Sequence, residues 1–384
     1  MSDRPDLHLF TPGPTGSTPE VIEATGRPVV PHYGERFITV YNRCIDLFKA
    51  VFQTENDLFL IIGPGTAALD ASLSSALPDG ARVLVPGGGW FGCRMADMCR
   101  AHRADVDFVE FPLDQAIDPE VVRRHLETAD VPYQAVAWVH HETSTGVLNP
   151  MEPVARAAKE HGALTIVDAV ASLGGVDLPV DAWDIDLCVS VTNKCLAAPP
   201  GISAVSVSPA AWEAIDANPS SRSWYLDLRT WRSYRQEWAG WHPFPSTVPS
   251  NIIEAATTSI EQILSEGLDV RIRRTAEAAT AVRSGLGRLG FEMFTADDIA
   301  SPVTTTSYAH PELPAADMQR FLMERSIFIS GGLADLAGRI FRIGHMGCSI
   351  ERSEVELLLG TVEDALRDAG ISVPDGSSLE NIWH

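Results

Sequence analysis

The sequence predicts an α/β protein, with a mostly parallel, doubly wound sheet of seven strands and a smaller α+β domain at the C-terminal end. Seven short runs rich in β-branched residues recur in the first part of the chain, and segments with helical spacing separate several of them. The runs are apolar throughout, which is typical of parallel strands covered by helices on both faces. A length of 384 residues also exceeds what one core usually serves, so two domains are expected.

The seven expected strands are residues 58–63, 82–87, 106–111, 134–141, 164–170, 186–191 and 202–208. Helical patterns between them include residues 119–127 and 151–162. Connections between parallel strands are right-handed, so such helices wind onto both faces of one sheet.

The pattern changes after about residue 215. Residues 221–250 are rich in Trp, Tyr, Ser and Pro and show no regular period. We interpret them as a linker or, because of the aromatic content, as a packed segment between subunits. A helical pattern runs from residue 251 to about 289. It is followed by strand-like residues 303–309, 326–332 and 339–345, and by helical patterns near 315–325 and 351–368, which together indicate an α+β unit.

The acidic composition restricts the partners of the protein. There are 51 acidic against 29 basic residues and no basic cluster, so neither a nucleic acid nor an anionic membrane surface is expected to bind. No apolar run approaches the length of a membrane span, and the first residues lack the basic-then-apolar order of a signal peptide. The six scattered cysteines form no CxxC pair, which favours reduced thiols in a cytoplasmic protein, and no metal site is predicted.

Functional side chains gather where the expected strands end, and ligands of open α/β sheets bind at that edge. The strand at 186–191 is followed by Lys194, one of only three lysines in the chain. The other two, Lys49 and Lys159, lie in helical patterns and fit surface positions. A buried lysine can lose its proton, whereas an arginine cannot, so Lys194 is the candidate amine nucleophile.

Two further features accompany this lysine. The turn Gly-Pro-Gly-Thr at 63–66 joins a strand to a helix, and its amides suit a phosphate, although a plain tight turn has equal weight. Asp168 ends an apolar strand and needs a partner. That partner is a helix N-terminus, a structural ion pair or the protonated ring nitrogen of a cofactor. The lysine, the phosphate site and the carboxylate together predict pyridoxal 5'-phosphate.

Aromatic and basic candidates add to this set. Trp90 and Phe91 follow a glycine-rich strand end, and one of them is expected to stack on the cofactor, with core packing as the alternative. Arg342 lies in the expected strand 339–345, where its guanidinium could bind a substrate carboxylate. The alternative for such an arginine is a surface ion pair, which is the role expected for Arg339.

Several stretches resemble one enzyme family over almost the whole chain. They are TPGPT, VFQTEN, GPGTAALDA, GGWFGCR, HHETSTGVLNP, TIVDAVASLGG, TNKCLAAPPG, SWYLDL, STVP and RIFRIGHMG. The chain is similar to the class V aminotransferases, which are fold-type I pyridoxal-phosphate enzymes, and most of all to alanine–glyoxylate and serine–glyoxylate or serine–pyruvate aminotransferases. The resemblance implies an N-terminal segment near the active site at 1–15, a large cofactor-binding domain at 16–266 and a small domain at 267–384.

The resemblance also implies roles around the cofactor ring. Lys194 would be the Schiff-base lysine and proton shuttle, and Asp168 would pair with the pyridinium nitrogen. Val170 would pack on the ring, and Phe91 occupies the stacking position, where the family often has Trp. Ser144 would form a hydrogen bond with the phenolic oxygen of the cofactor.

The implied phosphate site draws on two subunits. One chain would contribute Gly65, Thr66, Ala67 and Asn193, and the partner in a homodimer would contribute Thr247. The family has a tyrosine three residues before this threonine. Here the position is Phe244, which lacks the hydroxyl that this phosphate contact needs.

The implied function is a ping-pong transamination by a Schiff-base mechanism, from a small amino acid of the alanine or serine type to a small 2-oxo acid such as glyoxylate or pyruvate. Arg342 would bind the substrate carboxylate, and Gly13 would approach the substrate. TNKCLAAPPG, HHET, HPFPST and RIGHMG also resemble pyridoxamine–pyruvate aminotransferase, which acts on free pyridoxamine. That enzyme has an acidic residue where this chain has Pro64 and an additional arginine where it has Leu333, so bound pyridoxal phosphate is favoured.

The sequence leaves two other functions open. A lyase or cysteine desulfurase on the same fold would need a reactive cysteine on a mobile loop, and Cys348 is the nearest candidate, in a setting that does not match. A non-catalytic ligand-binding or regulatory protein would need an additional DNA-binding or partner domain, and none is visible in the sequence.

Overall fold

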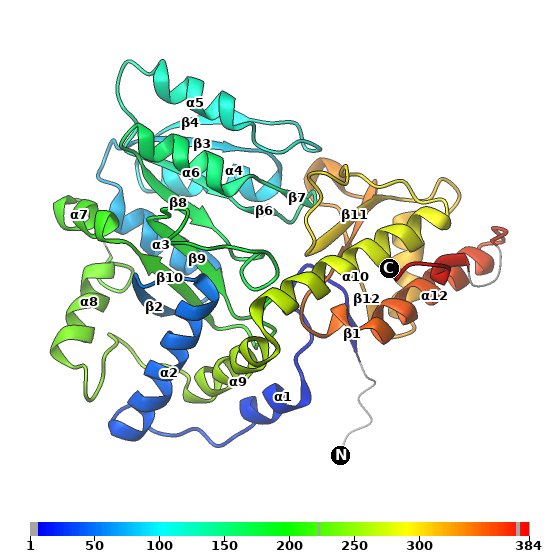
Figure 1. Cartoon of the computed structure of the whole chain (residues 1–384), viewed down its shortest axis with the longest axis horizontal. Helices are drawn as coiled ribbons and strands as arrows, with labels where there is room; N and C mark the ends of the chain where they lie inside the picture. Colours follow the sequence, from blue (N-terminus) through cyan, green and yellow to red (C-terminus); the bar gives the residue numbers. More distant parts are fainter. Residues whose placement is uncertain (1–6, 222, 374–376, 384) are drawn as a thin grey trace.

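A computed structural model describes residues 7–221, 223–373 and 377–383. Its largest feature is a seven-stranded sheet in the order β2-β10-β9-β8-β5-β3-β4 (Figure 1). β10 pairs antiparallel with β2 and β9, and the other neighbouring strands of this sheet pair in parallel. The predicted mostly parallel sheet is therefore confirmed. Its strands are β2 (Asp57–Ile62), β3 (Arg82–Gly87), β4 (Asp105–Glu110), β5 (Ala135–Val139), β8 (Leu164–Asp168), β9 (Leu187–Val191) and β10 (Ile202–Val207).

Helices between these strands cover both faces of the sheet. α3 (Gly65–Ala76) and α4 (Gly89–Ala101) lead from β2 to β3 and from β3 to β4, in one direction along the sheet. α5 (Pro119–Glu127) and α6 (Met151–Glu160) lead back from β4 to β5 and from β5 to β8. Right-handed crossovers therefore place the two pairs of helices on opposite faces. In the described part of the chain, no helix has both the length and the apolar character needed to cross a bilayer.

The segment at 221–250, which shows no regular period in the sequence, is partly helical in the structure. It contains a helix of 10 residues, α8 (Leu228–Glu237), whose first turn is capped by Asp227 through a hydrogen bond of 2.9 Å from the amide of Arg229. The helix buries only Leu228 and Trp231, which are one turn apart. Two buried positions are too few to produce a visible period, so the aspartate cap was the only local signal.

The helical pattern at 251–289 also divides in the structure. It forms α9 (Ser250–Glu266) and α10 (Leu268–Arg288), with Gly267 between them at a φ of 98°. Glycine reaches this conformation without strain, so the chain can turn between the two helices. α9 packs on α1 (Pro19–Thr25) and α2 (Glu35–Phe52), and α10 packs on the C-terminal elements (Figure 1).

A second apolar core lies in the C-terminal part of the molecule, where the sequence predicts an α+β unit. It is built on an antiparallel sheet in the order β11-β14-β13. The remaining elements are α7 (Pro209–Ala217), β6 (His141–Glu142), β7 (Val147–Leu148), β11 (Thr304–Tyr308), α11 (Ala315–Met323), β12 (Ile327–Phe328), β13 (Ser330–Gly331), β14 (Ile340–Gly344), α12 (Arg352–Asp368) and 3-10 turns at Ala334–Leu336, Gly347–Ile350 and Ser377–Leu379.

The N-terminal segment packs with this C-terminal unit. β1 (His8–Leu9) pairs in parallel with β12, and Phe10 is buried in the second core. The carbonyl of Phe10 also accepts a hydrogen bond of 2.6 Å from the amide of Gly344. Residues 1–6 of the expected segment 1–15 lie outside the described residues, and the expected domain boundary at 266/267 stays a prediction.

Candidate active site

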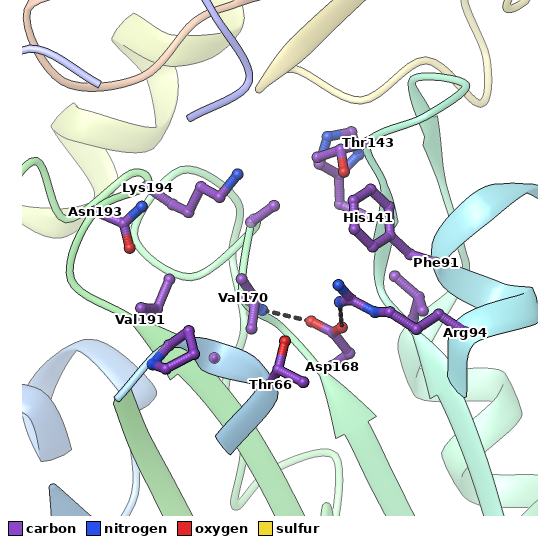
Figure 2. Close-up of a pocket in the computed structure, with 14 residues that line it drawn as sticks. Thr66, Phe91, Arg94, His141, Thr143, Asp168, Val170, Val191, Asn193 and Lys194 are labelled. Carbon is purple, nitrogen blue, oxygen red and sulfur yellow. Dashed lines mark hydrogen bonds and ion pairs between the residues drawn. The ribbon is translucent and has the colours of Figure 1, made fainter. Parts of the chain in front are cut away.

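A cavity of about 170 Å³ opens at the carboxyl ends of β5, β8 and β9, beside the first turns of α3 and α4 (Figure 2). Seven of the residues singled out from the sequence line it, namely Gly65, Thr66, Phe91, Asp168, Val170, Asn193 and Lys194. Pro64 also lines it, together with six residues that sequence reasoning did not select: Arg94, Val139, His141, Thr143, Ala171 and Val191. The edge of the sheet where strands end in functional side chains is thus also where the structure forms a cavity.

Lys194 projects from the turn that follows β9. Hydrogen bonds hold this turn, from the hydroxyl of Thr192 to the carbonyl of Pro199 at 2.6 Å and from the amide of Ala197 to the carbonyl of Lys194 at 2.9 Å. The amine contacts the carbonyl of Pro12 in the N-terminal segment. Burial lowers the pKa of Lys194 to about 8, because the charged form loses its hydration, while the carboxylate of Asp168 acts in the opposite direction. A neutral amine is therefore accessible at moderately alkaline pH.

Asp168 is the last residue of β8 and is buried. Its Oδ1 accepts a hydrogen bond of 2.9 Å from the amide of Val170, and its Oδ2 lies 3.7 Å from Nη2 of Arg94 (Figure 2). Burial raises the pKa of the Asp168 carboxyl, and Val170, Arg94 and Lys194 oppose that effect. The structure thus contains the ion pair that the sequence offered as one alternative, and the same carboxylate also lines the cavity.

Of the two neighbouring aromatic candidates, only Phe91 lines the cavity. Trp90 is 51% exposed and is absent from its lining. The guanidinium of Arg94 lies over the Phe91 ring, 4.5 Å from its centre. Arg94 follows Phe91 by three residues on α4, so helical spacing was a signal for it that sequence reasoning missed.

The turn at 63–66 leads into the N-terminus of α3, as expected. Gly65 approaches Val170 so closely that a Cβ atom at this position would lie 2.5 Å from Cγ2 of Val170. The first amides of a helix have no acceptor within the helix, so those of Gly65 and Thr66 suit an anion. Ala67 is absent from the lining, and its amide donates a hydrogen bond of 2.8 Å to the carbonyl of Pro64. The structure does not support the expected phosphate contact from Ala67.

The structure also does not bring Ser144 into the cavity. The hydroxyl of this buried residue donates to the carboxylate of Glu142 and accepts a hydrogen bond of 3.0 Å from the amide of Trp90. Thr143, one residue earlier, lines the cavity instead. The two neighbours lie in the turn between β6 and β7, where contacts with other segments set the direction of each side chain, so the sequence alone could not decide between them.

His141 is a further lining residue that the sequence did not single out. Its Nε2 lies 3.0 Å from Oγ1 of Thr304, and its Nδ1 lies 3.3 Å from the carbonyl oxygen of Val147. Burial lowers its pKa to about 3, so the ring is neutral at ordinary pH. His141 follows the end of β5 by two residues, so its position near the end of a buried strand was a signal similar to that of Asp168.

Besides Ala67 and Ser144, three more expected site residues lie outside the lining of the cavity. Gly13 is next to Lys194, and a Cβ atom there would lie 2.4 Å from Nζ. Arg342 is buried on β14 and donates from Nε to the carbonyl of Gly331 at 2.8 Å and from Nη1 to that of Thr143 at 2.9 Å. Thr247 is exposed.

Cys348 lies apart from Lys194. It lines a different cavity, together with Arg271, Arg274 and Glu266, and burial raises the pKa of its thiol. A desulfurase needs a reactive thiolate that reaches the cofactor, so this position gives no support to that alternative.

Comparisons with known proteins agree with this geometry. A family model described as Aminotransferase class-V matches residues 9–356. An uncharacterized aminotransferase of Methanocaldococcus jannaschii is 39% identical over 369 residues, which cover 96% of this chain and 94% of that protein. The crystal structure of ureidoglycine–glyoxylate aminotransferase from Bacillus subtilis aligns with a TM-score of 0.92 at 29% identity, over 99% of this chain and 98% of the other. That of pyridoxamine–pyruvate aminotransferase from Mesorhizobium loti aligns with a TM-score of 0.92 at 28% identity, over 100% and 97%.

Proposed function

Because the chain belongs to the class-V aminotransferase family, we propose that it moves an amino group from a small amino acid to a small 2-oxo acid, with pyridoxal 5'-phosphate bound beside Lys194. Family membership makes the protein a transaminase with the fold-type I architecture. The donor, the acceptor and the contacts of the cofactor belong to the proposal. The observation that carries it is a half-buried lysine, with its pKa lowered to about 8, in the same cavity as the buried carboxylate of Asp168.

The residues of the cavity fit this cofactor. Asp168 offers a buried carboxylate to a protonated ring nitrogen, and the side chains of Phe91 and Val170 can contact the two faces of a flat ring. The amides of Gly65 and Thr66 at the start of α3 suit the phosphate. When bound, pyridoxal phosphate supplies an aldehyde that condenses with amines and a ring that withdraws electrons from the substrate carbon.

Thr143 takes the place that the family resemblance assigned to Ser144. Its side chain lines the cavity, whereas the hydroxyl of Ser144 is engaged with Glu142 and Trp90. A threonine hydroxyl can donate one hydrogen bond, as a phenolic oxygen of the cofactor requires. Asn193, which also lines the cavity, remains the proposed side-chain donor on the phosphate side.

Lys194 and Asp168 would share the proton work. The neutral amine of Lys194 can take a proton from a substrate carbon and return it as an acid. Asp168 would keep the ring nitrogen protonated, since the amide of Val170 and the guanidinium of Arg94 stabilise its negative charge. The low pKa of the lysine matters because a protonated amine is neither a nucleophile nor a base.

Arg342 would recognise the carboxylate of the substrate. The carbonyls of Gly331 and Thr143 accept hydrogen bonds from its Nε and Nη1 and so orient the guanidinium plane. An arginine has five N–H groups, so donors remain for a planar carboxylate. A fixed guanidinium loses little entropy when it binds, which favours small substrates that offer only a carboxylate and an amine.

A homodimer and a cytoplasmic location complete the proposal. Thr247 is exposed and lies outside the cavity of its own chain, which suits a residue that completes the phosphate site of a partner. Tyr33, Trp238 and Trp241 are each about half exposed, and the ring centres of Tyr33 and Trp241 are 5.5 Å apart. A second copy would remove this aromatic patch from water. The six cysteines are free thiols, as expected in a reducing compartment.

A half-reaction screen tests the proposal. Protein loaded with pyridoxal phosphate is mixed with alanine, serine or aspartate while its visible absorbance is followed. The band should fall with the correct donor and return when pyruvate or glyoxylate is added. A Lys194→Ala protein that kept both the band and full turnover would refute the assignment of Lys194.

The same screen separates the pyridoxamine–pyruvate alternative. That alternative is favoured by the HHET motif and by the structural likeness, and it is opposed by Pro64, which puts no negative charge beside the phosphate position. Free pyridoxamine with pyruvate is therefore added to protein without cofactor. Turnover in this arm, with no response to any amino acid, would support the alternative.

A further inference from the structure

We propose that Glu142 is a positioning residue that holds the stacking ring of Phe91 and the cavity wall at Thr143 in fixed relation to each other. The proposal rests on the proposed function, since the ring matters only if it carries a cofactor. Glu142 belongs to β6, is buried and is absent from the lining of the cavity. Any effect it has on a bound molecule must therefore pass through its neighbours.

The carboxylate of Glu142 accepts hydrogen bonds from two separate segments. Its Oε2 accepts from the amides of Gly92 at 2.9 Å and Phe91 at 3.1 Å. Its Oε1 accepts from the amide of Ser144 at 3.0 Å and from the hydroxyl of the same residue. The hydroxyl of Ser144 in turn accepts from the amide of Trp90 at 3.0 Å.

The two amides of α4 are in its first turn, where a helix offers no internal acceptor. Glu142 therefore caps α4 from a distant part of the sequence, and its negative charge interacts favourably with the helix N-terminus. Through Ser144 it also fixes Trp90. Three consecutive amides, those of Trp90, Phe91 and Gly92, thus depend on one carboxylate, and the backbone that carries the Phe91 ring is held at its own N–H group.

The chain leaves room for this carboxylate at Gly89. Its φ is 74°, and a Cβ atom there would lie 2.7 Å from Cγ and Cδ of Glu142 and from Oγ of Ser144. A larger residue would push the start of α4 away from the turn between β6 and β7. The close approach at Gly89 is thus a second observation, which shows that α4 and this turn pack closely on Glu142.

The same turn carries the substrate side of the cavity. Thr143 lies between Glu142 and Ser144, lines the cavity and accepts the hydrogen bond from Nη1 of Arg342. On the other side of Glu142 in the chain, the ring of His141 is hydrogen-bonded to Thr304 on β11. Movement of Glu142 would therefore displace the ring of Phe91 and Thr143 together, and Thr143 is also the hydrogen-bond partner of Arg342.

The test compares Glu142→Gln with Glu363→Gln. A glutamine has one acceptor oxygen in place of two, so at least one of the four hydrogen bonds is lost. Glu363 on α12 is the control, because it is also a buried carboxylate that accepts from an amide and a hydroxyl, both of Ser378, at 3.1 and 2.6 Å, and it additionally pairs with Arg367. It is absent from the lining of the cavity.

Two measurements are made on each variant. Hydrogen exchange of residues 88–94 in protein without cofactor should be about tenfold faster for Glu142→Gln and unchanged for Glu363→Gln. The dissociation constant for pyridoxal 5'-phosphate, obtained by titration, should rise about tenfold for Glu142→Gln alone. If Glu142→Gln does not fold, Glu142→Asp, which keeps the charge but shortens its reach, should show the same two changes.

Unchanged exchange at 88–94, or an unchanged dissociation constant despite faster exchange, would overturn the proposal. Equal changes in both glutamine variants would also overturn it, because the effect would then be that of any lost buried carboxylate. Failure of the proposed function has a different signature. The wild-type protein would not bind pyridoxal phosphate at all, while the exchange measurement would still report whether Glu142 holds α4.

Discussion

Arg94 on α4 and Asp168 at the end of β8 form an ion pair across the cavity, with Nη2 and Oδ2 3.7 Å apart. Asp168 is buried, whereas the Arg94 side chain is one-third exposed. Replacing Arg94 with glutamine leaves the carboxylate with the amide of Val170 as its main partner. We expect the free energy of unfolding of the cofactor-free protein to fall by about 1 kcal/mol, less than for a fully buried pair because solvent screens the arginine.

Urea unfolding measures this change, and Arg100→Gln is the control. Arg100 is on the same helix and pairs with Asp97 at 3.0 Å, but both side chains are largely exposed. The Arg100→Gln substitution should lower the free energy of unfolding by no more than about 0.5 kcal/mol. Equal costs for the two substitutions would show that Asp168 does not depend on Arg94.

The second prediction concerns the pH dependence of Lys194. Its pKa is lowered to about 8 by burial, so the neutral, reactive amine appears as the pH rises through about 8. The rate at which trinitrobenzenesulfonate modifies Lys194, followed by mass spectrometry, should rise through pH 8 and level off above about pH 9. In the unfolded protein the same rise should continue to about pH 10.4, the ordinary value for lysine.

An Asp168→Asn variant sharpens this measurement. The negative charge of Asp168 raises the pKa of Lys194, so its removal should move the midpoint of the modification curve to lower pH. A midpoint that moves upward, or a wild-type midpoint near 10, would contradict the inferred environment of the amine.

The third prediction separates backbone strain from contact at Gly13. Gly13 has a φ of 102°, and an alanine Cβ there would lie 2.4 Å from Nζ and Cδ of Lys194. We expect Gly13→Ala to lower the free energy of unfolding by about 1 kcal/mol through strain and to slow cofactor attachment by displacing the amine. Gly34→Ala is the control, because Gly34 has a φ of 84° and open space around it. It should show the loss of stability alone, and equal attachment rates in the two variants would contradict the contact.

The fourth prediction distinguishes Thr143 from Ser144. Thr143→Val removes a hydroxyl from the cavity and should change the visible spectrum of bound pyridoxal phosphate with little loss of stability. Ser144→Ala removes the partner of Glu142 and the acceptor of the Trp90 amide, and should cost about 1–3 kcal/mol of unfolding free energy. Absorbance and thermal unfolding of both variants test this contrast. The reverse pattern would restore Ser144 as the cofactor contact.

The fifth prediction concerns substrate recognition by Arg342. Arg342→Lys removes the planar fork and should raise the KM for carboxylate substrates by about 10- to 100-fold, because charge-assisted hydrogen bonds of about 1.5–3 kcal/mol are lost. Steady-state kinetics test this, with Arg339→Lys as the control. Arg339 is exposed and lies just before β14, three residues from Arg342. A KM that does not change would exclude Arg342 as the carboxylate ligand.

The sequence alone predicts most of the fold. Six of the seven strands of the main sheet are mostly buried apolar runs, and their burial makes them visible in the sequence, whereas β4 at the edge of the sheet has no buried residue. α8 was missed because it buries only Leu228 and Trp231, and the break at Gly267 was hidden inside a continuous helical pattern. Helices that bury few residues, and helical patterns that are interrupted, depend on what packs against them, and that is not a property of the local sequence.

For the site, the sequence by itself determined that Lys194 and Asp168 follow neighbouring buried strands, because the ends of parallel strands meet at one edge. Only the tertiary structure decided which of two adjacent residues faces the cavity, Phe91 rather than Trp90 and Thr143 rather than Ser144. Side-chain direction at the end of a strand or in a turn is set by contacts with remote segments. The carboxylate of Glu142 is such a contact, since it joins the start of α4 to a turn 50 residues away in the chain.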